Sequence, residues 1–579
     1  MLERREFLGG LTAAGVAAAF ASQAFAATGR GSRLFSMGIL TDTHIGSYHT
    51  KGTERLVAAM ELFRREKTDF IVNVGDICDR HDPALYAAYR QTVDDVFPPD
   101  CPHPRELYVY AWHDAFAYKG HARDRSMQDQ DEAFADVRRY LRAENPPNFQ
   151  TVVRGIPILV FRQYFDAKEV DYEGLITKAE AEHPGKPVLV FDHQPLADTV
   201  DRTEVGGADG SFSRREILNR HPRVIHISGH IHGSLRNERN IWQGEFTAVN
   251  AGCLQVWGND PVRHEYGVIV MDVHEKAVVF RRFDVRDGTE IGADSRWIVP
   301  LPFDSETAPY RPERRRRTES VAEFPAAAKV EAVFEKGQLV LGFPEARGKG
   351  PAFKYEIACA GLFERTIYGD FSLREADRTG RARFSCSAAY FDPGVRYDVT
   401  VTPVGFFGGR GRPLVVQVER PAPEEGAVVR YDCRNPMEEL KLKIGTTDGD
   451  YAVRDGTFVA GGRMVGRLIL PKAATDVKVG ERLCVIADLQ TTTQEGEVFR
   501  TNVTGAAKPD WTACTSCQQI ASGRPNRVVY EFKRDARADE LCIYIHLAGR
   551  GPCAVRFERV RIIGLDSDGH QKTKGETHE

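Results

Sequence analysis

Short apolar runs, each followed by one or two Asp or His residues, are the feature of this sequence that most constrains its fold. Asp42 and His44 follow the first such run, and His230 and His232 follow one far along the chain. Strands of an α/β sheet that end at the same edge place ligand-binding residues together there. Because carboxylate and imidazole groups are metal ligands, the pattern predicts that these distant segments meet at one metal-binding edge.

Three further groups of the same kind lie between these two pairs. They are Gly75 to Arg80, then Trp112-His113-Asp114, then Asp192-His193. The final His-x-His is the strongest single signal, because alternate residues of an extended segment place both imidazoles on one side. Each group alone has an ordinary explanation as a turn or a helix cap. Their shared position after apolar runs is what argues for one site.

The same part of the chain alternates predicted strands and helices. Helices are expected at residues 53–67 and 83–96. Strands are expected at residues 34–41, 70–74, 107–111, 156–161, 187–191 and 224–228. This alternation predicts a layered α/β domain at residues 33–300, with a sheet covered on both faces.

The first 27 residues have the pattern of an export signal rather than of a folded segment. Arg4 and Arg5 precede a short apolar stretch rich in Ala and Gly, and Ala24-Phe25-Ala26 offers a cleavage site. An ordinary export signal or a membrane anchor is the alternative, but the stretch is short for a stable membrane span. We expect a bacterial protein exported by the twin-arginine route to the periplasm or the cell exterior.

The character of the sequence changes after residue 300. Residues 301–325 are rich in Pro, Arg, Glu and Ser and predict a linker, whose run Arg314 to Arg317 we interpret as solvated rather than as a polyanion site. Residues 326–421 and 425–566 alternate apolar and polar residues between turn residues, which predicts two all-β sandwich domains. Residues 567–579 predict a disordered tail.

The two β-rich regions carry looser signals. Strand order at residues 326–421 resembles a fibronectin type III domain, and residues 425–566 resemble the jelly-roll sandwich of carbohydrate-binding modules. Trp511 and nearby aromatic residues are candidates for stacking on sugars, and a sandwich that binds nothing is the alternative. Carbohydrate is thus a candidate partner of the C-terminal domain, whereas a net charge of −4 predicts no general affinity for nucleic acid.

Eleven cysteines, an odd number, permit disulfides but leave at least one thiol over. Cys514 and Cys517 have the spacing of a redox or zinc pair, but no second pair lies nearby to complete a four-ligand site. A local disulfide or two free thiols is the expectation for this pair.

These groups follow one another in the order Asp-x-His, Gly-Asp-x-x-Asp-Arg, His-Asp, single His and Gly-His-x-His. In this order they resemble the calcineurin-like metallophosphoesterase superfamily over about residues 34–285. The resemblance implies an α/β layered sandwich that hydrolyses a phosphodiester or phosphomonoester with hydroxide generated at two divalent ions, Mn, Fe or Zn. It assigns one ion to Asp42, His44 and His232, the second to His193 and His230, and the bridge to Asp76. It also implies that His113 faces the ester oxygen, Asp79 orients His113 and Arg80 contacts the phosphate.

One position departs from the pattern of that superfamily. Where the family has an asparagine whose amide oxygen binds the second ion, this chain has Trp112, whose indole N–H can only donate. Asp76, His193 and His230 would still provide three protein ligands, which suffices for a catalytic zinc. Two functions therefore stay open: a metal-dependent phosphoesterase with two ions or only one tightly bound, and a catalytically impaired glycan-binding protein at the surface or in the periplasm.

Overall fold

The computed structural model describes most of the chain. The described residues are 29–47, 51–116, 118, 127–163, 170–203, 212–255, 266–421, 428–447, 451–461, 464–478, 481–492, 499–505, 518–520, 522–533, 540–547 and 552–565. The expected export signal, Trp511, the pair Cys514 and Cys517, and the expected tail lie outside them. Within these ranges no helix has the length and apolar character to cross a membrane, and no disulfide joins two cysteines.

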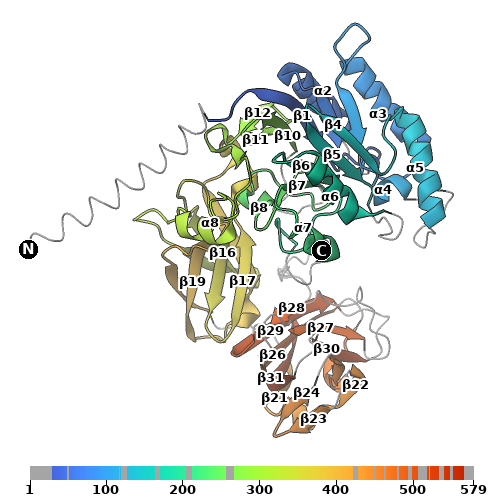
Figure 1. The fold of residues 1–579 in the computed structure, drawn as a ribbon. Coiled ribbons are helices and arrows are strands. Elements are labelled where there is room, and N and C mark those ends of the chain that lie inside the picture. Colours follow the sequence, from blue (N-terminus) through green and yellow to red (C-terminus); the bar gives the residue numbers. More distant parts are fainter. Residues whose placement is uncertain are drawn as a thin grey trace, which may run out of the picture.

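Two mixed β-sheets form the centre of the N-terminal domain (Figure 1). The first has the order β12-β11-β10-β1-β2-β3, with β13 also paired to β11, and the second has the order β4-β5-β6-β7-β9-β8. Strands of the first sheet are β1 (Arg33–Leu40), β2 (Phe70–Asn73), β3 (Arg105–Tyr108), β10 (Gly267–His274), β11 (Ala277–Asp284), β12 (Thr289–Ile291) and β13 (Trp297–Pro300). Strands of the second are β4 (Phe149–Val153), β5 (Ile156–Phe161), β6 (Val188–Asp192), β7 (Val224–Ser228), β8 (Ile241–Gln243) and β9 (Thr247–Asn250).

The two sheets pack face to face, and helices cover their outer faces. One buried cluster joins residues of the first sheet, such as Ile39 and Val72, to residues of the second, such as Val160, Phe191 and Ile227. Helices over the first sheet are α2 (Gly52–Glu66), α3 (Pro83–Val96) and α5 (Met127–Leu141), and those over the second are α6 (Tyr172–Glu182) and α7 (Phe212–Leu218). Short helical turns are α4 (Trp112–Ala115), η2 (Glu238–Asn240) and η3 (Ala293–Ser295).

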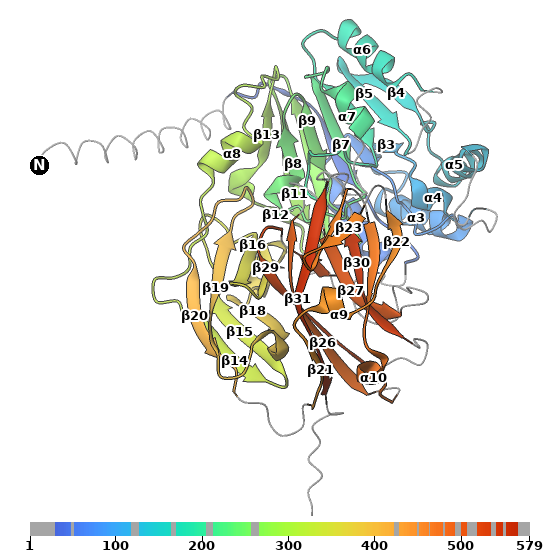
Figure 2. The ribbon, with the colours of Figure 1, turned by 90° about the horizontal axis from the view of Figure 1, so that it is seen from below.

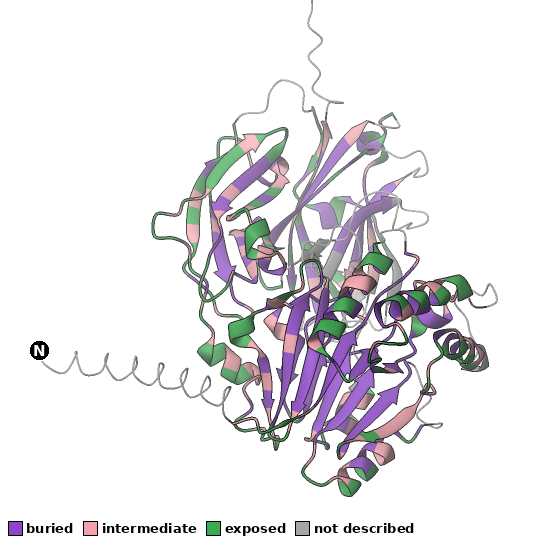
Figure 3. Cartoon of the chain, turned by 90° about the horizontal axis from the view of Figure 1, so that it is seen from above, coloured by how far each residue is buried: buried purple, intermediate pink, exposed green. Residues whose placement is uncertain are grey.

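The pattern-based expectation of a single sheet covered on both faces is therefore wrong in its layering, whereas the two packed sheets agree with the layered α/β sandwich that the resemblance implies. The strands are buried on both faces in a single sheet between helices and also in two packed sheets with helices outside, and Figure 3 shows this burial for the domain. Both arrangements therefore need strands of the same apolar composition. Only the pairing of strands distinguishes one sheet from two. The predicted elements themselves lie close to the observed ones, and β5, β7 and α3 have the predicted bounds.

Two β-rich regions follow, and both are consistent with β-sandwiches (Figure 2). The first pairs a sheet of order β14-β15-β18 with one of order β17-β16-β19-β20. Its elements are β14 (Glu331–Glu335), β15 (Gln338–Pro344), β16 (Lys354–Cys359), β17 (Phe363–Tyr368), η4 (Asp370–Ser372), η5 (Glu375–Asp377), β18 (Arg381–Ser387), η6 (Ala388–Tyr390), β19 (Arg396–Val404) and β20 (Leu414–Glu419).

The last region contains a sheet of order β23-β24-β31-β26-β29, with β21 paired to β31, and a sheet of order β22-β25-β30-β27-β28. Its elements are β21 (Val428–Cys433), α9 (Pro436–Glu439), β22 (Leu442–Thr447), β23 (Tyr451–Arg454), β24 (Thr457–Ala460), β25 (Met464–Ile469), α10 (Lys472–Thr475), β26 (Arg482–Thr492), β27 (Phe499–Gly505), β28 (Gln518–Ile520), β29 (Pro525–Lys533), β30 (Leu541–Leu547) and β31 (Cys553–Leu565). Arg527 of β29 pairs with Asp392 at 3.1 Å and ties this region to the preceding one.

The segment expected to be a solvated linker contains a short helix, α8 (Pro312–Thr318). Arg315 of this helix donates a hydrogen bond of 2.7 Å to the Glu238 carboxylate of the N-terminal domain. Glu319, just after the helix, accepts hydrogen bonds of 2.9 Å from the backbone N–H groups of Phe407 and Gly409 in the next region. This part of the segment therefore joins the two regions through specific contacts.

Candidate metal centre

The predicted ligands come together from the loops that follow β1, β2, β6 and β7. Asp42, His44 and His232 form one group whose candidate ligand atoms lie within 4.8 Å of one another. The Oδ1 atom of Asp42 lies 3.2 Å from Nε2 of His232 and 3.8 Å from Nε2 of His44. All three side chains are buried, so a cation between them would be shielded from water.

A second group brings together Asp76, His193 and His230, also within 4.8 Å. The Oδ2 atom of Asp76 lies 3.0 Å from Nε2 of His193 and 3.7 Å from Nε2 of His44, which belongs to the first group. This oxygen therefore lies between the two groups. The arrangement has the geometry of a candidate dinuclear centre in which one carboxylate serves both halves.

The backbone at the centre adopts a conformation that is uncommon for residues with side chains. Five of the six candidate ligands have positive φ angles: Asp42 (51°), His44 (43°), Asp76 (50°), His230 (73°) and His232 (50°). Such residues cost on the order of 1–3 kcal/mol each and cluster where function requires them. Their concentration here indicates that the surrounding fold holds the ligands in place at the expense of local stability.

Two glycines allow the loops to approach closely enough to form the centre. A Cβ atom on Gly75 would lie 2.8 Å from Nδ1 of His193, and one on Gly229 would lie 2.7 Å from Oδ2 of Asp42. Neither position has room for a side chain without displacing a ligand.

Backbone carbonyls orient two of the imidazole rings. His193 donates from Nδ1 to the carbonyl of Val74 at 2.7 Å, and His232 donates from Nδ1 to the carbonyl of Gln255 at 2.6 Å. Each Nε2 atom is then the one turned towards the carboxylates. Hydrogen bonds of this kind fix the tautomer of a metal-binding histidine and raise its basicity.

The charge state of the centre also fits divalent cations. Burial opposes the charge of Asp42, but His232 and His193 outweigh it and hold the pKa of Asp42 well below its usual value. Burial likewise opposes protonation of His44 and His193, but their carboxylate neighbours raise the pKa of His44 to about 10 and that of His193 to about 9. Asp42 Oδ1 is buried and takes no hydrogen bond from the described residues. Protonated imidazoles thus occupy the role that cations would take.

Binding of divalent ions at neutral pH is therefore expected to release about two protons per chain, one each from His44 and His193. Since a pKa raised to about 9–10 keeps these rings protonated until the pH exceeds it, metal affinity should rise as pH rises from 6 to 9. Calorimetric titration with Mn²⁺ or Zn²⁺ in buffers of different ionisation enthalpy measures the proton count. Release of no protons would contradict this assignment of the ligands.

His113 lies beside the first group, and its environment differs from the one expected. Its ring centroid is 4.6 Å from that of His44, and its Nδ1 donates to the backbone carbonyl of Asp79 at 2.9 Å. The Asp79 carboxylate, expected to orient His113, instead lies 3.3 Å from Nδ1 of His44. Asp79 thus orients His113 through its main chain, and the hydrogen bond with His44 lowers the pKa of Asp79.

Arg80 is paired with an acidic residue of the same loop. Its guanidinium lies 3.6 Å from the carboxylate of Asp82, the residue that caps α3, and its side chain is 43% exposed. Its contact with phosphate stays a prediction.

Asp114 and two asparagines shape the loops around the centre. Asp114 is buried and accepts hydrogen bonds from the backbone N–H groups of Ile77 at 3.0 Å and Ala111 at 3.1 Å. Burial and the charge of Asp76 raise the pKa of Asp114 to about 7. Asn73 and Asn250 each accept a 3.1 Å hydrogen bond from the backbone N–H of the glycine two residues later, so both shape turns.

Trp112 provides no ligand atom to the centre. Its indole lies 4.8 Å from the ring of His113 and 4.7 Å from that of Phe116, and the side chain is 36% exposed. Its backbone N–H donates to the side-chain oxygen of the buried Gln163 at 2.8 Å. The tryptophan therefore forms part of the rim of the centre beside His113.

The two packed sheets and the paired carboxylate–imidazole groups define an α/β domain with a candidate dinuclear metal centre. Residues 35–234 match the family model described as calcineurin-like phosphoesterase, and this part of the chain is a calcineurin-like phosphoesterase domain. No curated protein matches the chain.

Solved structures that match parts of the chain share little sequence identity with it. A dimetal phosphatase from Danio rerio is 12% identical to this chain, with a TM-score of 0.31. The match covers 46% of this chain and 99% of the chain of that phosphatase. A purple acid phosphatase from yellow lupin (Lupinus luteus) seeds is 12% identical, with a TM-score of 0.34, and the match covers 47% of this chain and 54% of the lupin chain. A xylan-binding domain of Paenibacillus barcinonensis Xyn10C is 11% identical, with a TM-score of 0.19, and the match covers 25% of this chain and 100% of that domain.

Proposed function

We propose that this protein is an exported, metal-dependent phosphoesterase that hydrolyses a phosphodiester or a phosphomonoester. The observation that carries the proposal is the position of Asp76 Oδ2, within 3.0 Å of His193 Nε2 and 3.7 Å of His44 Nε2. One carboxylate oxygen thereby faces both ligand groups. The paired arginines at residues 4 and 5 support export.

Asp42, His44 and His232 would hold one divalent ion, and His193 and His230 the other, with Asp76 shared between them. When bound, such ions polarise a phosphoryl oxygen and lower the pKa of water, and both effects promote hydrolysis near neutral pH. The chain contributes a buried, preorganised ligand set, so the side chains need little rearrangement on binding. Three protein ligands remain for the second ion despite Trp112, and that number is sufficient in catalytic zinc sites.

His113 is the candidate for proton exchange with the ester oxygen. Because its Nδ1–H is given to the Asp79 carbonyl, exchange with a substrate would take place at Nε2. Burial lowers the pKa of His113, so the ring is largely neutral at pH 7 and its contribution as an acid should be modest there. The backbone N–H of His113 also donates to Asp76 Oδ1 at 3.1 Å, which holds the main chain of this residue beside the metal centre.

The proposal is tested by hydrolysis of aryl phosphate monoesters and diesters in the presence of added Mn²⁺ or Zn²⁺. Wild-type protein should turn over at least one class, and His113→Ala should lower kcat by about 10²-fold, the low end for general acid–base catalysis, because the neutral ring is a weak acid. His274→Ala, which changes a histidine at the end of β10, serves as the matched control and should leave kcat unchanged.

Trp112→Asn in the same assay distinguishes an active enzyme from an impaired one. Wild-type protein that binds few ions and is inactive, but gains both metal and turnover with Trp112→Asn, would support the glycan-binding alternative for the natural protein. Metal-stimulated turnover by wild type, reduced by His113→Ala, would support the phosphoesterase. Inactivity of all variants with a full complement of ions would contradict the proposal.

A further inference from the structure

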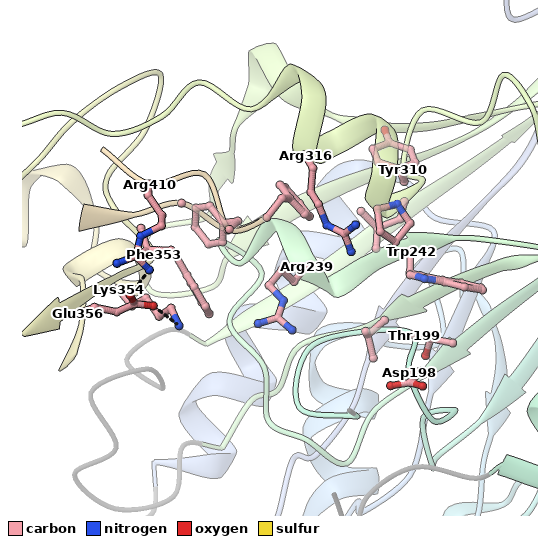
Figure 4. Close-up of a pocket in the computed structure, with 18 residues that line it drawn as sticks. Asp198, Thr199, Arg239, Trp242, Tyr310, Arg316, Phe353, Lys354, Glu356 and Arg410 are labelled. Atoms are coloured by element: carbon pink, nitrogen blue, oxygen red, sulfur yellow. Dashed lines mark hydrogen bonds and ion pairs between the residues drawn. The ribbon is translucent and has the colours of Figure 1, made fainter. Parts of the chain in front are cut away.

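A second candidate binding site lies away from the metal centre, where the N-terminal domain and the first β-rich region meet α8. A groove of about 410 Å³ is lined by all three parts of the chain (Figure 4). Arg239 and Trp242 come from the N-terminal domain, Arg316 comes from α8, and Phe353 and Arg410 come from the following region. The candidate metal ligands are not among the described residues that line the groove, so any ligand here would bind independently of them.

Two guanidinium groups enter this groove from different walls. Figure 4 shows Arg239, which belongs to η2, and Arg316, which belongs to α8, both among the residues that line the groove. Arg239 is held by a 3.0 Å ion pair with Asp201 and lies 5.5 Å from the ring centroid of Phe353. The guanidinium of Arg239 is thus preorganised, because Asp201 and Phe353 fix its position.

Arg316 differs from its neighbour on the same helix. Arg315 is bound to Glu238, whereas the guanidinium of Arg316 has no ion pair or hydrogen bond with any residue in the described ranges. Asp201 balances the charge of Arg239, whereas the Arg316 side chain is exposed to solvent. The groove therefore presents a positive charge that no protein group balances.

The acidic residues that line the groove are already paired with other cations. Glu356 lies 3.2 Å from Nζ of Lys354 and also contacts Arg410, and Asp198 lies 3.3 Å from Arg215. Neither carboxylate is therefore positioned to neutralise Arg316. These ion pairs leave Arg316 as the uncompensated positive charge among the described residues that line the groove.

We propose that this groove binds a phosphate group, either as inorganic phosphate or as a phosphate monoester with a planar or apolar substituent. A phosphate presents several acceptor oxygens and can accept forked hydrogen bonds from two guanidinium groups at once, whereas one bidentate arginine already satisfies a carboxylate. Trp242, Phe406 and Phe407 provide aromatic surface for a substituent.

The experiment is titration of the full-length protein with inorganic phosphate, phenyl phosphate and benzoate, followed by calorimetry. Bound metal is first removed with a chelator that is then dialysed away, so that phosphate cannot bind through ions. Wild type should bind both phosphates, with phenyl phosphate tighter if the aromatic wall contacts the substituent. Arg316→Ala should weaken phosphate binding at least about tenfold, as expected for a charge-assisted hydrogen bond.

Arg317→Ala is the matched control, since it removes an exposed arginine from the same helix that does not line the groove. Equal affinity of Arg316→Ala and Arg317→Ala, or no phosphate binding by metal-free wild type, would overturn the proposal. Benzoate that binds as tightly as phenyl phosphate would overturn the assignment to phosphate. Arg239→Lys, which keeps the charge but loses the fork, should also weaken binding, and its thermal stability shows whether the fold is retained.

Discussion

Asp76→Asn is expected to lower phosphoester hydrolysis by about 10³-fold or more, since bound metal supplies several kcal/mol of transition-state stabilisation and 1.36 kcal/mol corresponds to tenfold in rate. The reason lies in the position of the Asp76 carboxylate, whose Oδ2 faces both ligand groups. Replacing it removes a negative charge and one oxygen ligand from both halves of the centre. Both ions should therefore bind more weakly.

Asparagine is the informative replacement because it preserves the shape of the loop. The Asp76 Oδ1 atom accepts a 3.1 Å hydrogen bond from the backbone N–H of His113, and an amide oxygen can accept the same hydrogen bond. A loss of activity would then reflect the lost charge rather than a displaced His113.

Metal content per chain and hydrolysis rate are measured together for wild type, Asp76→Asn and the control Asp100→Asn, which changes an exposed carboxylate. We expect Asp100→Asn to match wild type in both measurements. Full metal content with activity within a few-fold of wild type in Asp76→Asn would show that this carboxylate does not bridge the two halves.

Glu238→Ala is expected to destabilise the N-terminal domain by about 3 kcal/mol, because removing one partner of a buried ion pair leaves an uncompensated charge. Arg282 is 1% exposed and donates to Glu238 Oε1 at 2.8 Å. Glu238 Oε2 also accepts hydrogen bonds from Trp297 Nε1 at 3.1 Å and from Arg315 at 2.7 Å. We take the low end of the range for such pairs because the Glu238 side chain is 28% exposed.

The contribution of Glu238 to the free energy of unfolding should depend on pH in a defined direction. Burial opposes its charge, but Arg282 and Arg315 outweigh burial and hold the pKa of Glu238 below 4.5, its ordinary value. A carboxyl with a lowered pKa stabilises the fold above that ordinary value, and the stabilisation is lost as pH falls through the folded-state pKa. The difference between wild type and Glu238→Gln should therefore be constant near neutral pH and shrink below 4.5.

Calorimetric unfolding at several pH values measures this difference. Glu313→Ala removes an exposed glutamate of α8 and is the matched control. Since Arg315 links α8 to Glu238, limited proteolysis at residues 301–325 should also become faster in Glu238→Ala. An unfolding transition unchanged within experimental error would contradict the proposed role of this cluster.

The candidate centre was largely predictable because its signals are local. Asp-x-His and His-x-His, each placed after an apolar run, predicted that Asp42, His44, His230 and His232 end strands, and the structure brings these residues together. The strand β7 and the helix α3 have the predicted bounds, since their residues carry the periodicity and capping signals of each element.

Features that depend on residues distant in sequence were not predictable in this way. Nothing near Asp79 indicates that its carbonyl, rather than its carboxylate, would contact His113, because that depends on how two loops meet. Arg315 and Arg316 are adjacent in one basic run, yet one is bound to Glu238 and the other enters the groove. Their roles are set by the domain against which α8 packs.

The sequence by itself determined which elements form and which side chains end them, because periodicity, capping and turn chemistry act over a few residues. The tertiary structure alone decided how the strands pair into the two sheets and that Trp112 lies on the rim beside His113. These outcomes depend on strand pairing and on contacts between loops far apart in the chain, for which a single sequence carries no local signal.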